Sequence, residues 1–284
     1  MLSDEAIQDY HALTEGIGRV ELTNWTTISL TGDDRSSFLH NLCTNDIKSL
    51  QPGDQCEAFL TDVKGKIVAH VLVFAFEDRL QLLSVPDQGE LIVQHLDRYL
   101  IREKVELADE SNGMNWSVVT DSLSESFQSP FLGVPACIVS KVPDSHANLR
   151  VCSDEAFDAL RLEAGWPLFG IDFDNTNLPQ EVCRDERAIH FNKGCYLGQE
   201  TIARIDALGH VNQELTQVKL SGDVPASLPA DVFIGEKKVG QVTSASYSPK
   251  YESVIGLAML RREAKMSNAD EMVCEGAAMA ILAP

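Results

Sequence analysis

Residues 191–204 read Phe-Asn-Lys-Gly-Cys-Tyr-Leu-Gly-Gln-Glu-Thr-Ile-Ala-Arg, and this stretch carries the most informative pattern in the chain. Gly194 and Gly198 bracket Cys195, which predicts a tight and exposed loop. The loop leads into a helix that we expect to begin near Gln199. The segment is therefore interpreted as a glycine-framed thiol at the entrance of a helix.

The side chains of this loop are compatible with a reactive thiol beside a binding surface. Cys195 stands just before the expected helix and two residues after Lys193, so both positive charges would favour its thiolate. Tyr196 and Gln199 are able to stack on and hydrogen-bond a flat heterocycle. Spacing alone equally allows a glycine-bounded connection with a structural cysteine, so the residues by themselves leave both interpretations open.

Outside this stretch, several common signatures are missing. The chain contains no Gly-x-Gly-x-x-Gly, no P-loop, no His-Glu-x-x-His and no Gly-x-Ser-x-Gly, so nucleotide-dependent redox, phosphoryl transfer and triad hydrolysis lose support. The seven cysteines show no Cys-x-x-Cys spacing. Cys183, His190 and Cys195 lie close in sequence but match no standard ligand set, so we predict no metal site.

The composition describes an acidic protein of 284 residues with a formal net charge of −20. Such a surface repels phosphate backbones and anionic lipid, which argues against direct nucleic-acid binding and against membrane docking. No apolar run approaches the roughly 20 residues that a membrane helix needs. The acidic, polar start lacks the features of a targeting peptide, so a cytoplasmic location is expected.

Hydrophobic periodicity predicts an α+β fold. A strand is expected at 24–30, a helix after Gly32, and a β-hairpin from the apolar runs 67–76 and 80–85. An amphipathic helix over 87–101 would lie on that hairpin sheet. Further strands are expected at 104–107, 116–120 and 136–141, another helix at 154–164, and short strands at 217–220, 231–234, 239–247 and 254–260.

These elements suggest three parts. Residues 54–149 fit a ferredoxin-like α+β domain, because two hairpin strands, a helix and further strands follow one another. Residues 214–284 hold short strands punctuated by Gly and Pro, which is typical of a small β-barrel. The remaining residues, 1–53 and 150–213, carry the glycine-framed loop.

The stretch 193–200, Lys-Gly-Cys-Tyr-Leu-Gly-Gln-Glu, resembles the signature Lys-Gly-Cys-(Phe/Tyr)-x-Gly-Gln-Glu of the YgfZ family. That family is related to the glycine-cleavage aminomethyltransferase, the GcvT-like T-protein. The resemblance covers nearly the whole chain. It is supported by Arg161-Leu-Glu-Ala-Gly, Asp172, Asn177-Leu-Pro-Gln-Glu181, Ala203-Arg-Ile-Asp-Ala-Leu-Gly-His, residues 30–46, Lys64-Gly-Lys-Ile67 and residues 239–258.

The resemblance implies a three-lobed fold around a tetrahydrofolate pocket, with 1–53 plus 150–213 as the folate-binding domain. It also implies a role in assembling or repairing iron–sulfur enzymes, including tRNA-modifying ones, as client proteins. Cys195 would be the residue on which activity rests, and Glu163 would hydrogen-bond the pterin ring. Arg204 would meet the glutamate tail. The residues that would shape the same cofactor-binding loop are Lys193, Tyr196, Gln199 and Glu200.

One departure from the relatives bears on activity. Aminomethyltransferases carry a catalytic aspartate in a Gly-x-x-Asp-Asp segment, where this chain has Val68 or Ala69. No neighbour replaces its charge, so glycine-cleavage activity is not expected. Asp62 and His70 are nearby titratable groups that sequence spacing does not place. Whether the protein is an enzyme stays open: the alternatives are a folate-dependent one-carbon (aminomethyl or methyl) transferase or demethylase, or a cluster carrier that uses Cys195.

Overall fold

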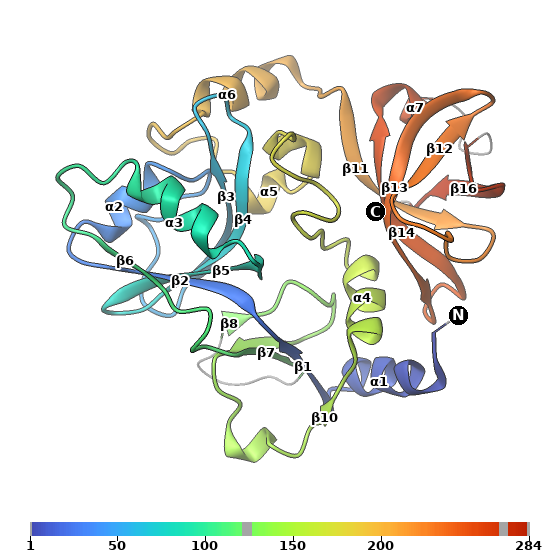
Figure 1. Cartoon of the computed structure of the whole chain (residues 1–284), viewed down its shortest axis with the longest axis horizontal. Helices are drawn as coiled ribbons and strands as arrows, with labels where there is room; N and C mark the ends of the chain where they lie inside the picture. Colours follow the sequence, from blue (N-terminus) through green and yellow to red (C-terminus); the bar gives the residue numbers. More distant parts are fainter. Residues whose placement is uncertain (1, 121–126, 267–271, 283–284) are drawn as a thin grey trace.

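The computed structural model describes residues 2–120, 127–266 and 272–282, and these form two β-sheets, a closed β-barrel and the helices that connect them (Figure 1). The first sheet has the strand order β10-β1-β7-β9-β8. Its pairs are antiparallel except for β1 and β10, which run parallel. The strands are β1 (Gly18–Leu22), β7 (Trp116–Val119), β8 (Phe127–Gln128), β9 (Cys137–Val139) and β10 (Arg150–Val151).

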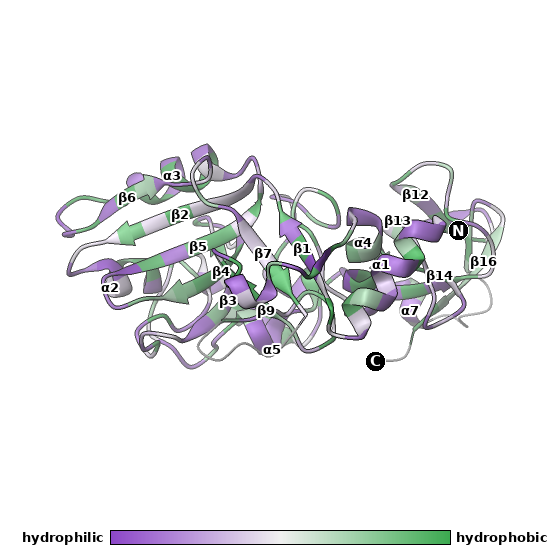
Figure 2. Ribbon diagram, turned by 90° about the horizontal axis from the view of Figure 1, so that it is seen from below, coloured by the Kyte–Doolittle hydropathy of each residue, from purple (hydrophilic) through white to green (hydrophobic). Residues whose placement is uncertain are grey.

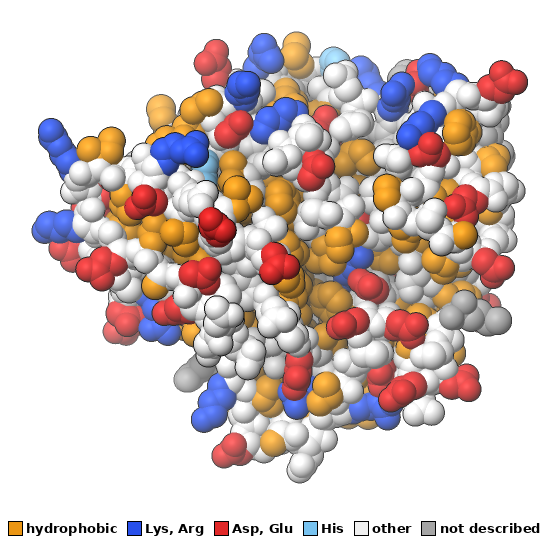
Figure 3. Space-filling model, in the orientation of Figure 1, with side chains coloured by type: hydrophobic (Ala, Val, Ile, Leu, Met, Phe, Trp, Pro, Cys, Tyr) orange, Lys and Arg blue, Asp and Glu red, His pale blue; other side chains and the backbone are white. Residues whose placement is uncertain are grey.

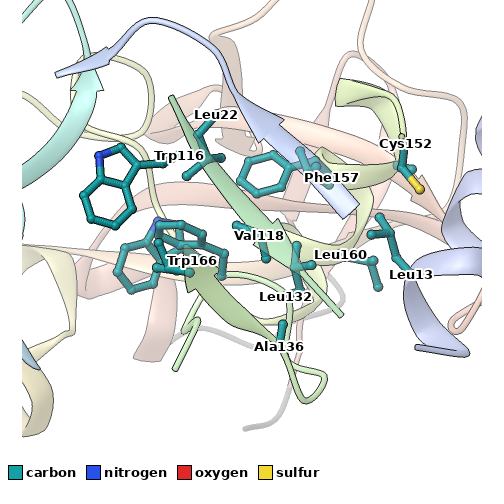
Figure 4. Close-up of a cluster of buried hydrophobic side chains, with 14 of the residues drawn as sticks. Leu13, Leu22, Trp116, Val118, Leu132, Ala136, Cys152, Phe157, Leu160 and Trp166 are labelled. Atoms are coloured by element: carbon teal, nitrogen blue, oxygen red, sulfur yellow. The ribbon is translucent and has the colours of Figure 1, made fainter. Parts of the chain in front are cut away.

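Helices α1 (Asp4–Thr14) and α4 (Asp154–Glu163) pack against the first sheet. Ser3 caps α1, because its hydroxyl accepts a hydrogen bond from the backbone N–H of Ala6. The core between these elements is aromatic, and Figure 4 shows Trp116, Trp166 and Phe157 gathered around strand β7. This core holds α4, and with it the position of Glu163, firmly against the sheet.

The second sheet is antiparallel throughout, with the order β3-β4-β5-β2-β6. Helices α2 (Arg35–His40) and α3 (Gly89–Asp97) bury Phe38, Leu39, Ile92 and Leu96 in its core. The β4–β5 hairpin was predicted from the two apolar runs and is confirmed. The strands are β2 (Trp25–Thr31), β3 (Gln55–Thr61), β4 (Ile67–Ala75), β5 (Arg79–Pro86) and β6 (Glu106–Asp109).

The C-terminal strands close into a six-stranded barrel with the order β11-β14-β13-β12-β15-β16. The prediction of a small barrel from about residue 214 is confirmed, and so is the α+β fold class. The last two strands were not predicted, because each is only three to five residues long. The barrel elements are β11 (Gln213–Leu220), β12 (Ala230–Ile234), β13 (Lys237–Ser248), β14 (Ser253–Arg261), α7 (Arg262–Met266), β15 (Met272–Cys274) and β16 (Ala277–Ile281).

Helix α4 stands between the two sheets and the barrel, and α1 packs beside it (Figures 1 and 2). A buried ion pair fastens α4 to the barrel: Arg161 donates to Asp172 (3.1 Å) and to the hydroxyl of Ser244 (3.1 Å). Asp172 in turn accepts from Ser244. The remaining helical segments are the 3₁₀ turns η1 (Asp144–His146) and η2 (Pro179–Val182), with α5 (Asp185–Ala188) and α6 (Gln199–Leu208).

Strand pairing divides the chain differently from the expected segments. Strand β2 precedes residue 54 but pairs with both β5 and β6, so the second sheet extends beyond the expected segment 54–149. Strands β7, β8 and β9 fall within 54–149 but join β1 and β10 in the other sheet. The partner of a strand is a long-range property, and a local apolar pattern does not encode it.

Candidate functional site

The loop 193–200 connects the short helix α5 to α6, which begins at Gln199 as predicted. Gly198 caps α6 with φ of +81°, a conformation that favours glycine. A Cβ at this position would lie 2.5 Å from the carbonyl oxygen of Asp62 and 2.7 Å from Cα of Gly65. The loop is therefore pressed, backbone against backbone, onto the turn of the β3–β4 hairpin.

Lys193 is a structural clamp in this loop. Its Nζ donates to the carbonyl oxygens of His40 (2.5 Å), Cys43 (2.8 Å) and Asn45 (2.6 Å). The side chain is buried, and burial lowers the pKa of its ammonium. These carbonyls belong to the end of α2 and the turn that follows, so Lys193 joins the loop to α2. Its three hydrogen bonds are directed to the backbone, and a contact of this ammonium with the Cys195 thiol or a cofactor stays a prediction.

Tyr196 is also part of the support of the loop. Its ring packs with Ile189 and Ile202, and it lies 4.8 Å from the ammonium of Lys193. Only 8% of the residue is exposed, and burial raises the pKa of its phenol. The ring thus packs in an apolar cluster beside the lysine, and its stacking on a flat heterocycle stays a prediction.

The other predicted residues of the loop and helix reach solvent. Cys195, Glu200 and Arg204 are exposed, and Gln199 is half-buried. The thiol thus stands on a loop whose backbone is fixed by Gly198 and by the clamp beneath it. The arrangement is a rigid support that carries an exposed cysteine.

Glu163 lies at the C-terminal end of α4 and is half-buried. Its carboxylate accepts from the phenol of Tyr10, at 3.1 Å to each oxygen, and from the hydroxyl of Ser248. Burial raises the pKa of the carboxyl group. Tyr10 comes from α1 and Ser248 from the end of β13, so three separate elements fix this one carboxylate. Among the described residues, the hydrogen bonds of the Glu163 carboxylate go to Tyr10 and Ser248 and not to the loop 193–200.

A buried ionic cluster on the second sheet was not predicted. Glu57 on β3 accepts from Nε of Arg184 (2.8 Å) and from its Nη2 (2.6 Å), and it lies 2.8 Å from Nε2 of His70 on β4. The His70 ring stacks on Phe59 and Trp166, with centroids 4.9 and 5.2 Å apart. The hydrogen bonds from Arg184 and His70 hold the pKa of Glu57 at about 2, against the opposing effect of burial.

A sequence signal for this cluster did exist. Glu57 and His70 each interrupt a run of apolar residues on a buried strand, and a charge in such a place requires a partner. His70 follows Val68 and Ala69, where the relatives are expected to carry an aspartate. Ala69 is fully buried, so this part of the hairpin offers the imidazole of His70 and no carboxylate from β4.

The surface is hollowed between the second sheet and the barrel, and Figure 3 shows an apolar band in this hollow with a few charged side chains beside it. Five cavities of about 340–590 Å³ lie among the described residues, and the seven predicted site residues line none of them. Within the described ranges, no group of three or more His, Cys, Asp or Glu side chains is arranged to hold a metal ion. No helix in the described part of the chain is long and apolar enough to cross a membrane.

Comparison with known proteins gives a consistent set of relatives. Residues 214–279 match the family described as the glycine cleavage T-protein C-terminal barrel domain. The chain is 24% identical to a putative chloroplastic transferase of Arabidopsis thaliana, over 92% of this chain and 68% of the relative. It is 27% identical to the tRNA-modifying protein YgfZ of Vibrio vulnificus, over 77% and 74% of the two chains.

The fold has a solved counterpart. The glycine cleavage system aminomethyltransferase T from Bartonella henselae superposes with a TM-score of 0.85, over 98% of this chain and 88% of that one. The sequence identity is 15%, so this likeness concerns the fold. The expectation of a T-protein-like architecture with a C-terminal barrel is confirmed.

Proposed function

We propose, from the premise that the chain is a YgfZ/GcvT-like protein, that it binds a tetrahydrofolate and supports the assembly or repair of iron–sulfur enzymes, tRNA-modifying ones among them. The observation that carries the proposal is the exposure of Cys195 on a loop of fixed backbone. A cysteine kept only for packing would be buried. The seven cysteines are all free thiols, which suits the reducing cytoplasm in which we place the protein.

The residues around Glu163 fit a pterin. A carboxylate accepts through two oxygens with about four lone-pair sites, and Tyr10 and Ser248 donate to it from the protein side. Its half-buried position leaves acceptor capacity for the ring N–H and exocyclic amine of a pterin, a two-pronged and charge-assisted contact. Gln199, Glu200 and Arg204 stay proposed contacts for the rest of the cofactor, with Arg204 meeting the glutamate tail.

Calorimetric titration of tetrahydrofolate under anaerobic conditions tests the cofactor. Glu163→Gln removes the charge and one acceptor, so affinity should fall by about 10- to 150-fold, the equivalent of about 1.5–3 kcal/mol for a charge-assisted contact. Glu155→Gln is the matched control, because Glu155 is an exposed carboxylate on the same helix. Equal binding by wild type and Glu163→Gln, with both folded by circular dichroism, would remove Glu163 from the site. No binding by wild type would remove folate from the proposal.

The thiol is tested separately in cells that lack their own copy of the protein. Cys195→Ser should fail to restore the activity of an iron–sulfur tRNA-modifying enzyme under oxidative stress. Cys183→Ser is the control, since Cys183 is the other exposed cysteine. Full restoration by Cys195→Ser would refute the role of this sulfur, whatever the calorimetry shows.

The similarity to aminomethyltransferases favours a second candidate, a folate-dependent one-carbon transferase or demethylase acting on a different amine. The apolar Val68 and Ala69 argue against glycine cleavage itself, because a developing cationic group would meet no carboxylate there. Turnover of a methylamine donor by purified protein with tetrahydrofolate would establish this activity. Absence of turnover with bound folate would leave the maintenance role.

A further inference from the structure

Three cavities join into one groove along α4. The first, of about 550 Å³, lies where the end of β5 meets the start of α3, and it shares Thr23, Pro86 and Asp87 with the second, of about 590 Å³. The second shares Asp158, Gly170 and Ile171 with a third of about 390 Å³ that reaches the barrel. We call this continuous feature the acidic groove.

The floor of the groove is apolar in its middle section. The second cavity is lined by Leu22, Trp25, Phe157 and Leu168. Ile171 stands at the junction with the third cavity and is 57% exposed, an unusual degree for a large aliphatic side chain beside a hollow. Apolar residues of a ligand would be removed from water by this floor, which contributes about 25 cal/mol for each Å² buried.

The lining of the groove is strongly negative. It contains six carboxylates and one cation, Arg161. Two of these carboxylates are already paired, Asp158 with Arg161 (2.5 Å) and Glu21 with Arg19 (2.7 Å). Arg161 is also paired with Asp172 (3.1 Å), so neither cation neutralises the remaining four carboxylates. Within the described residues, no ion pair to Asp87 or Asp154 is found. The carboxylates are Glu21, Asp87, Glu90, Asp109, Asp154 and Asp158.

One polar atom in the lining is unsatisfied. The side-chain Oε1 of Gln88 is buried and has no hydrogen-bond partner among the described residues. A buried acceptor without a donor lowers stability, because it has lost its hydrogen bonds to water. An N–H or ammonium donor supplied by a bound chain would remove this cost.

We propose that the acidic groove docks a basic, amphipathic polypeptide segment of a partner protein. Apolar side chains of the segment pack on the floor beside Ile171, while its Lys or Arg side chains meet the carboxylates along the rim. Nucleic acid and acidic partners are repelled by the same charges. The groove is distinct from the proposed folate contact, because Glu163 is bonded to Tyr10 and Ser248, neither of which lines it.

Fluorescence anisotropy with a labelled peptide of about ten alternating Lys and Leu residues, extended at about 3.3 Å per residue, tests the proposal. An acidic twin with Glu in place of Lys should not bind. The double variant Asp87→Asn/Asp154→Asn should weaken binding of the basic peptide about tenfold at low salt. Ile171→Ser should weaken it about fivefold, and this loss should persist at high salt, where charge effects are screened.

The control is needed because a chain of net charge −20 attracts any cationic peptide. Asp223→Asn/Glu236→Gln makes the same charge change at exposed positions on the barrel, outside the groove, and should leave affinity within about twofold. An equal loss in this control, or binding of the acidic twin, would overturn the proposal. So would sedimentation showing that wild type self-associates and Ile171→Ser does not, since the occupant would then be a second copy. Glu163→Gln should bind the peptide normally, which separates this test from the folate titration.

Discussion

Replacing Glu57 with glutamine tests the buried cluster of the second sheet. Glutamine keeps the shape of the side chain but removes the charge that Arg184 pairs with and His70 contacts. The guanidinium of Arg184, buried against Trp166 at 4.6 Å, would then lack its carboxylate. Removal of one partner from a buried pair costs about 3–5 kcal/mol. We expect Glu57→Gln to lower the free energy of unfolding at pH 7 by that amount.

The pH dependence provides a second and sharper magnitude. The pKa of Glu57 is about 2 in the folded protein, compared with 4.5 for the free side chain. Because the folded value is depressed, the unfolded chain binds the proton more tightly. The resulting stability is complete above about pH 4.5 and disappears as the pH falls towards 2. A difference of this size corresponds to about 3 kcal/mol.

Urea denaturation at pH 6, 5, 4 and 3 measures both quantities. The stability difference between wild type and Glu57→Gln should be largest at pH 6 and should shrink as the pH falls, because only the wild type loses the contribution of this carboxylate. Glu236→Gln is the control, since Glu236 is exposed, and its difference should stay near zero. A constant difference across this pH range would refute the claim that Glu57 is a paired, ionised group.

Three further predictions concern the glycine-framed loop. Lys193→Met should lower the unfolding free energy by about 3–5 kcal/mol in urea, because three buried carbonyls lose their shared donor. Gly198→Ala should lower the unfolding free energy by at least 1–3 kcal/mol, roughly the cost of a strained backbone. Gly194→Ala should leave the unfolding free energy nearly unchanged, since the nearest atom to its Cβ would be 4.0 Å away. Native protein should show one rapidly alkylated thiol that Cys195→Ser removes and Cys183→Ser does not. Although Cys183 is exposed as a residue, desolvation of its sulfur raises the pKa of the thiol to about 11, so its thiolate fraction is about 100-fold below that of an ordinary cysteine.

The conformation of this loop was accessible from the sequence because its causes are local. The pattern of two glycines, at 194 and 198, followed by the polar Gln199 predicts a turn that leads into a helix. The helix α6 begins at Gln199. The exposure of Cys195 follows from the same chemistry. Local turn signals depend on neighbours in the chain, and these are visible without a structure.

The roles of Lys193 and Tyr196 were not accessible in this way. The carbonyls that receive the lysine lie about 150 positions earlier in the chain, and backbone carbonyls carry no sequence label. From the sequence, Lys193 is interpreted as a charge that favours the Cys195 thiolate. In the structure its ammonium clamps the loop to α2 through three backbone carbonyls. The same limit applies to strand β1 and to the partners of β2, which are fixed by pairing across long separations.

Glu163 represents an intermediate case. The resemblance identified the residue, but its partners come from Tyr10 near the start of the chain and Ser248 near its end. A sequence comparison aligns each of the three positions separately and does not show that their side chains are in contact. The geometry adds that this carboxylate is already oriented before any ligand arrives.

The hydrogen bonds of Glu163 to Tyr10, near the start of the chain, and to Ser248, near its end, limit how the chain can be truncated. A fragment that stops before the barrel has no hydroxyl from position 248, and one that starts after the first helix has no phenol from position 10. Either truncation leaves the Glu163 carboxylate with one of its two side-chain donors, even if every remaining element folds. A barrel taken from a relative would have to place a hydroxyl donor where Ser248 stands. This single hydrogen bond therefore limits which barrels can replace the native one.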